Sequence, residues 1–251
     1  MDYFRELKSG NGKRRMIPVA LRARVGSPTV MPVGSIASDV LIRRPGTLAV
    51  RVMQAVIVLL IGYGLMTRNL SIVVNGSLGL ATTFLPAVLK RDYEIAMDPP
   101  LVLWITVAIL LHTIGMVGPY DTVWWWDNLT HTLSAAVVAG VGYAVTRAID
   151  EYWEEIHFPA DFMFVYIILF TLAAGVLWEV LEFAGRGLAR STGQDAVLVQ
   201  YSLADSIVDL IFDAVGAVIV GFLGQGRFAR LSESLEMALE RIYGDDRDLK
   251  P

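Results

Sequence analysis

The sequence contains no cysteine and little charge for its length. The absence of cysteine excludes disulfide bonds, thiolate metal ligands and cysteine nucleophiles. Only 18% of the 251 residues are charged, whereas 55% are hydrophobic and the mean hydropathy is +0.53. These values are too apolar for a water-soluble domain of this size. The composition therefore predicts an integral membrane protein that has the lipid bilayer as its main solvent.

The motifs of several soluble enzyme classes are also missing. The sequence has no Walker phosphate loop, no dinucleotide fingerprint, no zinc-protease helix motif and no basic patch interleaved with aromatic residues. We therefore expect no nucleic-acid partner. The first apolar run of membrane length begins near Leu48, after a long basic leader, so no secretory signal peptide is expected.

Six apolar stretches approach the length of a membrane span. A helix needs roughly 20 apolar residues to cross a hydrocarbon core of about 30 Å. We therefore predict an all-α, polytopic bundle of about six transmembrane helices. The first two are joined by three residues only, which predicts a helical hairpin. The predicted spans are residues 48–66, 70–89, 100–117, 128–145, 162–183 and 206–223.

The distribution of Lys and Arg predicts the orientation of these spans. Residues 1–47 are rich in both, whereas the loop 118–127, with its three consecutive tryptophans, has neither. Because basic loops stay inside, we expect both termini to be cytoplasmic and the tryptophans to lie at the outer interface of a cell membrane.

The chain therefore divides into three predicted parts. Residues 1–47 form a disordered cytoplasmic leader, because charges, Pro and Gly are mixed there without periodicity, and residues 48–225 form the transmembrane domain. Residues 226–251 carry an amphipathic cytoplasmic helix, with Phe228, Leu231, Leu235 and Ile242 on one face. This helix is expected on the membrane surface, with docking to a partner as the alternative.

Ionisable residues gather at one end of four predicted spans. Each costs about 2.5–3.5 kcal/mol to insert, so those present usually face a cavity or one another. Consecutive antiparallel spans share an end, which places all these groups in one leaflet, the outer one in the predicted topology. Spacings of three or four put each set on one helix face, which predicts a shared funnel-shaped site. The residues are His112, Asp127, His131, Glu179, Glu182, Arg186, Asp205, Asp209 and Asp213.

The composition of this cluster indicates a bound cation. Several carboxylates cannot all ionise together in a low-dielectric pocket, so protons, the neighbouring arginine and histidines, or a metal ion must compensate. Carboxylate oxygens with one or two imidazoles suit a divalent ion such as magnesium, manganese or zinc. The candidate metal ligands are Asp127, His131, Glu179, Glu182, Asp209 and Asp213, and the candidate catalytic residues are His131, Glu179, Asp209 and Asp213.

Several of these residues also have a structural explanation. Asp127 and Asp205 stand where helix N-caps occur, and Glu182 with Arg186 has the spacing of an ordinary ion pair. His112 borders an apolar stretch, where a hydrogen-bonded structural histidine is the more common case. The four catalytic candidates are harder to explain in this way, because they lie a turn or more inside their spans without a Lys or Arg beside them.

Three segments carry a resemblance to known families. LHTIGMVGPYDTVWWWDNLTHTLSAAVVAG, WEVLEF and DSIVDLIFDAVGAVIVG, in that order, resemble the uncharacterised YjdF-like family of predicted membrane proteins over roughly residues 70–224. The pair Asp127 and His131, the helix with Glu179 and the aspartate-rich last helix are also similar to VanZ-like membrane proteins, although Asp213 stands where those have asparagine. Neither resemblance implies an established reaction. The YjdF-like pattern falls on His112, Asp127, His131, Glu179, Glu182, Asp209, Asp213, Gly216 and Ala217.

Three functions remain open from the sequence. The first is a metal-dependent membrane enzyme, a hydrolase or transferase acting on a phosphorylated or lipid-linked substrate. The second is a proton- or cation-coupled transporter, for which a homo-oligomer could complete the path across the bilayer. The third is a structural protein whose polar stripes fasten helices together. The sequence identifies no small-molecule or lipid ligand beyond these classes.

Overall fold

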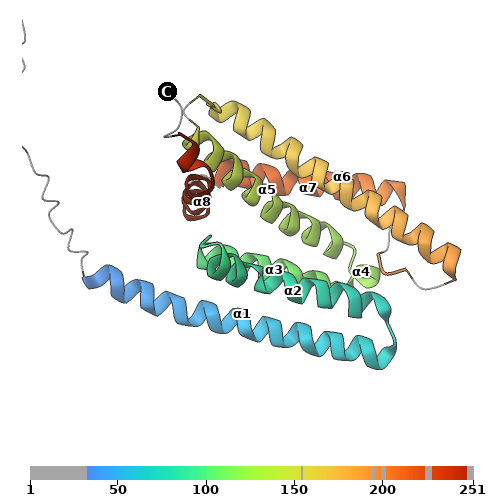
Figure 1. The fold of residues 1–251 in the computed structure, drawn as a ribbon. Helices are drawn as coiled ribbons and strands as arrows, with labels where there is room; N and C mark the ends of the chain where they lie inside the picture. Colours follow the sequence, from blue (N-terminus) through green and yellow to red (C-terminus); the bar gives the residue numbers. More distant parts are fainter. Residues whose placement is uncertain (1–32, 154, 194–195, 199–201, 224–227, 248–251) are drawn as a thin grey trace, which may run out of the picture. The chain divides into compact units, whose positions relative to one another are not determined.

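The computed structural model describes residues 33–247, apart from 154, 194–195, 199–201 and 224–227. Every regular element in the described part is a helix, and Figure 1 shows their course. The helices are α1 (Val33–Thr67), α2 (Leu70–Asp92), α3 (Pro99–Gly115), α4 (Pro119–Thr122), α5 (Trp126–Tyr152), α6 (Ala160–Thr192), α7 (Leu203–Leu223) and α8 (Ala229–Arg247).

Within the described residues, four helices are long and apolar enough to cross a membrane. They are residues 46–67 of α1 together with α2, α5 and α6. Helix α3 is apolar but shorter, and α7 carries three aspartates. The all-α membrane architecture predicted from the sequence is therefore confirmed. The start of α1 at Val33 precedes the predicted span, and the leader before Val33 lies outside the described residues.

Helices α1 and α2 form the predicted hairpin. The connection is Arg68, which adopts a positive φ of 55°, and Asn69, whose side chain accepts a hydrogen bond from the Ile72 amide at 3.1 Å. Asn69 thereby caps the start of α2. Further along, Gln54 Nε2 donates to Thr83 Oγ1 at 2.9 Å between buried side chains. This polar contact holds the two helices together where water is absent.

The backbones of α5 and α7 approach each other very closely. A Cβ atom at Gly216 of α7 would lie 2.5 Å from the carbonyl oxygen of Thr132 and 3.0 Å from the amide nitrogen of Ala136. Only glycine fits there, because both neighbouring atoms belong to the α5 backbone. Thr132 Oγ1 also lies 3.4 Å from the carbonyl oxygen of Phe212. This close packing brings the polar faces of the two helices together.

The two faces of α7 differ sharply. Asp209 and Asp213 are buried against the bundle, with 3% and 6% of their surface exposed. The exposed face carries large apolar side chains at helical spacing. They are Ile207, Ile211, Val215, Ile219 and Phe222. This arrangement suits a helix that faces lipid on one side and a polar protein interior on the other.

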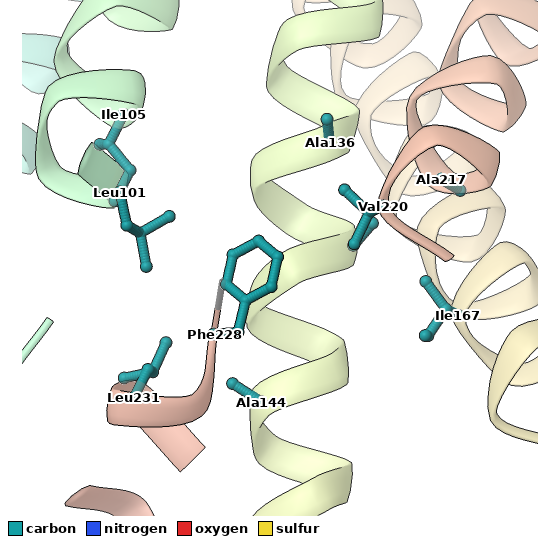
Figure 2. Packing of buried hydrophobic residues seen from close by; sticks show 10 residues of the cluster. Leu101, Ile105, Ala136, Ala144, Ile167, Ala217, Val220, Phe228 and Leu231 are labelled. Carbon is teal, nitrogen blue, oxygen red and sulfur yellow. The ribbon is translucent and has the colours of Figure 1, made fainter. Parts of the chain in front are cut away.

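Helix α8 docks on α5 through its N-terminal end. Phe228 and Leu231 are almost fully buried, and Figure 2 shows the Phe228 ring between Leu101 of α3 and the α5 backbone. Gly140 of α5 makes room for this ring, because a Cβ there would lie 2.2 Å from Phe228 Cζ. The predicted apolar face therefore packs partly on the protein itself, although Ile242 remains exposed.

Two arginines of α8 hold this helix to the loop between α2 and α3. Arg230 Nε lies 3.1 Å from Asp98 Oδ1. Arg241 pairs with Glu94 and donates from Nη2 to the carbonyl oxygen of Tyr93 at 2.9 Å. Helical periodicity alone could not separate docking on the bundle from binding to lipid, because both need the same apolar face.

The close approach of α5 and α7 makes a direct prediction. Gly216→Ala places a methyl group against backbone atoms that cannot rotate away, so the helices must separate. We expect a destabilisation of about 1–3 kcal/mol, seen as a lower Tm in detergent. Gly62→Ala in α1 is the control, because a Cβ there meets nothing within 4 Å. Equal melting temperatures for both variants would contradict the packing described here.

Candidate metal centre

His131 lies at the centre of a group of carboxylates from two helices. Asp127 is one turn before it on α5, with Oδ1 3.7 Å from His131 Nε2. Helix α7 supplies Asp209, whose Oδ1 lies 3.8 Å from the same nitrogen. The other ring nitrogen, Nδ1, lies 3.2 Å from Asp213 Oδ1. The imidazole is thus flanked by carboxylates on both of its nitrogen sides.

The two sides of the imidazole have different geometry. At 3.2 Å, Nδ1 can donate its hydrogen to Asp213, and in the neutral imidazole Nε2 then carries the free lone pair. The 3.7 and 3.8 Å distances from Nε2 are too long for hydrogen bonds. Ligand atoms around one zinc ion, with bonds of about 2.0–2.2 Å, stand roughly 3.3–3.6 Å apart in a tetrahedron. The distances from Nε2 to Asp127 and Asp209 are only slightly longer than this spacing.

These three residues form a compact set of ligand atoms. One atom each from Asp127, His131 and Asp209 lies within 4.8 Å of the other two. Asp209 Oδ1 is buried and has no hydrogen-bond partner. A buried polar atom without a partner costs about 1–3 kcal/mol, and more when it is charged. This oxygen is therefore suited to binding a cation.

Helix α6 contacts the same cluster. Phe164 meets Gly221, and Gly175 meets Asp213, so α6 and α7 run antiparallel. A Cβ at Gly175 would lie only 2.2 Å from Asp213 Oδ2. One turn further on each helix places Glu179 level with Asp209. Glu179 is 8% exposed, and neither of its carboxylate oxygens has a hydrogen-bond partner.

Three further predicted residues lie outside the three-residue ligand set. Glu182 is half-buried on α6 and accepts a hydrogen bond from Trp178. Arg186 is one turn beyond it and also half-buried. Asp205 is half-buried in the first turn of α7. Trp178 could not be predicted from the sequence, because a tryptophan among apolar residues carries no distinguishing pattern.

The N-cap explanation for two aspartates is wrong. Helix α5 begins before Asp127, and no side-chain hydrogen bond caps it. At the start of α7, Ser202 Oγ accepts a hydrogen bond from the Asp205 amide at 3.1 Å, so the serine caps the helix. Both carboxylates nevertheless lie in the first turn of their helices, where a negative charge is favoured by the helix dipole.

His112 belongs to a separate hydrogen-bonded chain. Its Nδ1 lies 2.7 Å from the Tyr120 hydroxyl, which in turn donates to Thr130 Oγ1 at 3.2 Å. Thr130 then donates to the carbonyl oxygen of Asp127 at 2.9 Å. His112 therefore fits the structural explanation given from the sequence, and its chain supports the turn that presents Asp127.

An open cavity of about 490 Å³ lies at the ends of α4, α5 and α7. Asp127 lines this cavity and also belongs to the ligand set, so the cavity borders the cluster at this residue. Asp121 and Asp205 add two carboxylates to the wall, and Tyr120 and Trp124 add aromatic rings. No Lys or Arg is among the described lining residues.

Together these features define a multi-helix membrane protein with a buried group of carboxylates around one imidazole. The chain belongs to the family described as Predicted membrane protein (DUF2238), whose model matches residues 48–230. No curated protein and no solved structure matches the chain. The matched range contains every residue of the cluster, whereas the family description carries no reaction.

The contact between Gly175 and Asp213 can be tested through His131. Gly175→Ala must displace the Asp213 carboxylate, which removes the hydrogen-bond partner of His131 Nδ1. We expect diethylpyrocarbonate to modify His131 several-fold faster, measured by mass spectrometry of the histidine peptides. Gly187→Ala on the same helix is the control, since its Cβ meets nothing within 4 Å. Unchanged reactivity in both variants would contradict the proposed contact.

Proposed function

We propose that the protein is a membrane-embedded, metal-dependent enzyme whose divalent ion is bound by Asp127, His131 and Asp209. The supporting observation is the two-sided environment of His131. Metal-binding histidines usually donate their second ring N–H to a carboxylate, which fixes the ring and its tautomer. Asp213 is in that position, with Nδ1 3.2 Å away, while Nε2 faces the two other aspartates.

The donor set favours zinc or manganese over magnesium. One imidazole nitrogen and two carboxylate oxygens match the ligands of these ions, whereas magnesium prefers oxygen donors alone. Three protein ligands also leave a position for water or substrate, as in catalytic zinc sites. A bound ion would activate that water and polarise a substrate oxygen. The reaction class we propose is therefore hydrolysis or group transfer.

The cavity supports a substrate that approaches from the end of the bundle. Asp127 joins the cavity to the ligand set, and the wall contains carboxylates and aromatic rings. Because no Lys or Arg is among the described lining residues, a phosphorylated or lipid-linked substrate would bind mainly through the metal. Trp124 is 87% exposed near the cavity, which suits the headgroup level of a bilayer.

We infer that α3 and α7 also cross the membrane, which gives six spans. The 21 residues of α7 extend about 31 Å, and its exposed face is apolar. The 17 residues of α3 extend about 25 Å, close to the thickness of the hydrocarbon core. With both termini cytoplasmic, as the basic residues indicate, the centre lies in the outer leaflet of a cell membrane.

Cysteine labelling can test this topology without background labelling of the natural chain, because the sequence has no cysteine. Thr122→Cys and Lys90→Cys each place a single thiol at an exposed position. Residue 90 lies in α2, before α3, and residue 122 lies in α4, after it. We expect a membrane-impermeant maleimide to label Cys at 122, and not at 90, in intact cells. Permeabilised cells should give labelling at both positions. The reverse pattern in intact cells would contradict the orientation.

A proton- or cation-coupled carrier is the second candidate. The observation that favours it is Glu179, whose buried oxygens have no hydrogen-bond partner and could bind a transported cation. The described ionisable cluster is confined to one end of α5, α6 and α7, however, so a path across the bilayer would need a homo-oligomer. The resemblance to YjdF-like and VanZ-like proteins stays a prediction, and it favours neither the enzyme nor the carrier.

Metal binding itself is the main prediction of this proposal. Purified protein in detergent should bind zinc or manganese, and saturation at 100 times Kd should add about 2.7 kcal/mol of stability, seen as a higher Tm. Asp209→Asn should abolish this rise, because it removes a buried ligand. Asp161→Asn is the matched control, at the exposed far end of α6. If metal raised the Tm of Asp209→Asn as much as that of the natural protein, this centre would be excluded.

A further inference from the structure

Glu179 is not explained by a single metal ion at the proposed centre. Both of its carboxylate oxygens are buried and neither has a hydrogen-bond partner. Among the described residues, no other side chain has two buried carboxylate oxygens in this condition. An ionised carboxylate in such a place is strongly disfavoured unless a cation or a proton compensates it.

The surroundings of Glu179 are dominated by negative charge. The register of α6 against α7 places it level with Asp209, as the contact of Gly175 with Asp213 shows. Glu179 also lies within electrostatic range of Asp209, Asp127 and Glu182. The one imidazole in the cluster, His131, is already shared among three aspartates.

Counting charges shows what a single ion would leave uncompensated. A divalent ion at the first centre balances Asp127 and Asp209, which lie on either side of His131 Nε2. Asp213 keeps its negative charge, but it has a hydrogen-bond partner in His131 Nδ1. Glu179 then remains as a buried carboxylate with no counter-charge from these groups.

We propose that a second divalent cation binds between Asp209 and Glu179, with Asp209 bridging the two ions. This inference rests on the proposed metal centre. Magnesium and manganese often bind through one or two carboxylates and complete their shells with water or substrate oxygens. Two protein carboxylates and an open cavity beside Asp127 provide that kind of site. The second ion is therefore expected to bind more weakly than the first.

A permanently protonated Glu179 is the competing explanation, and an isosteric variant separates the two. Glu179→Gln imitates the protonated acid in shape and charge. If Glu179 only holds a proton, this variant should bind as many ions as the natural protein. If Glu179 binds a cation, the variant should lose one ion and retain the other.

The experiment is titration of the full chain in detergent with Mn²⁺, combining equilibrium dialysis with electron paramagnetic resonance. We expect two ions per chain and a spectrum of two coupled Mn²⁺ ions, because a bridging carboxylate holds such pairs about 3.5–4 Å apart. Glu179→Gln should bind one uncoupled ion, and the ion that it retains shows that it is folded. Glu233→Gln, at an exposed position of α8, is the control and should keep two.

The outcomes separate this inference from the proposed function. One uncoupled ion in the natural protein, with the same result for Glu179→Gln, overturns the second site and leaves the first intact. Two ions in Glu179→Gln also overturn it. No bound ion in the natural protein removes the proposed centre and the second site with it. The coupling in the natural protein tests the inference even if Glu179→Gln does not fold.

Discussion

The contact of His131 with Asp213 is the interaction on which the rest of the centre depends. In a membrane interior, polar side chains must find partners in the protein because lipid offers none. His131 on α5 and Asp213 on α7 meet at 3.2 Å, and the absence of a side chain at Gly216 permits the close approach of these helices. This contact fixes the imidazole and turns its second nitrogen toward the remaining aspartates.

Helix α6, the third helix of the centre, also packs through a glycine that makes room for a polar side chain. Gly175 lets α6 pack against the Asp213 carboxylate, and the antiparallel register then brings Glu179 to the level of Asp209. Small residues are thus placed where polar side chains of the neighbouring helix need space. The outer faces of α6 and α7 remain apolar, so charge and lipid contact are separated on the same helices.

Much of this arrangement could be predicted from the sequence. Apolar length and charge segregation identified the helices, and consecutive antiparallel spans had to bring His131 and Asp209 to the same end. Spacing could not show that Asp213 orients the imidazole while Asp127 faces the other nitrogen, because these roles depend on helix rotation and contact. The docking of Phe228 could not be predicted from the sequence either, since it depends on the space left at Gly140, which is distant in the sequence.

The central claim is that His131 Nε2 and two aspartates bind one metal ion. X-ray absorption spectroscopy of the zinc-loaded full chain tests this most directly, because it reports the donors around the ion itself. The account predicts a single imidazole nitrogen at about 2.0–2.1 Å together with oxygen donors, and loss of the imidazole signal in His131→Gln. A shell of oxygens without imidazole, or the same spectrum for His131→Gln, would contradict it.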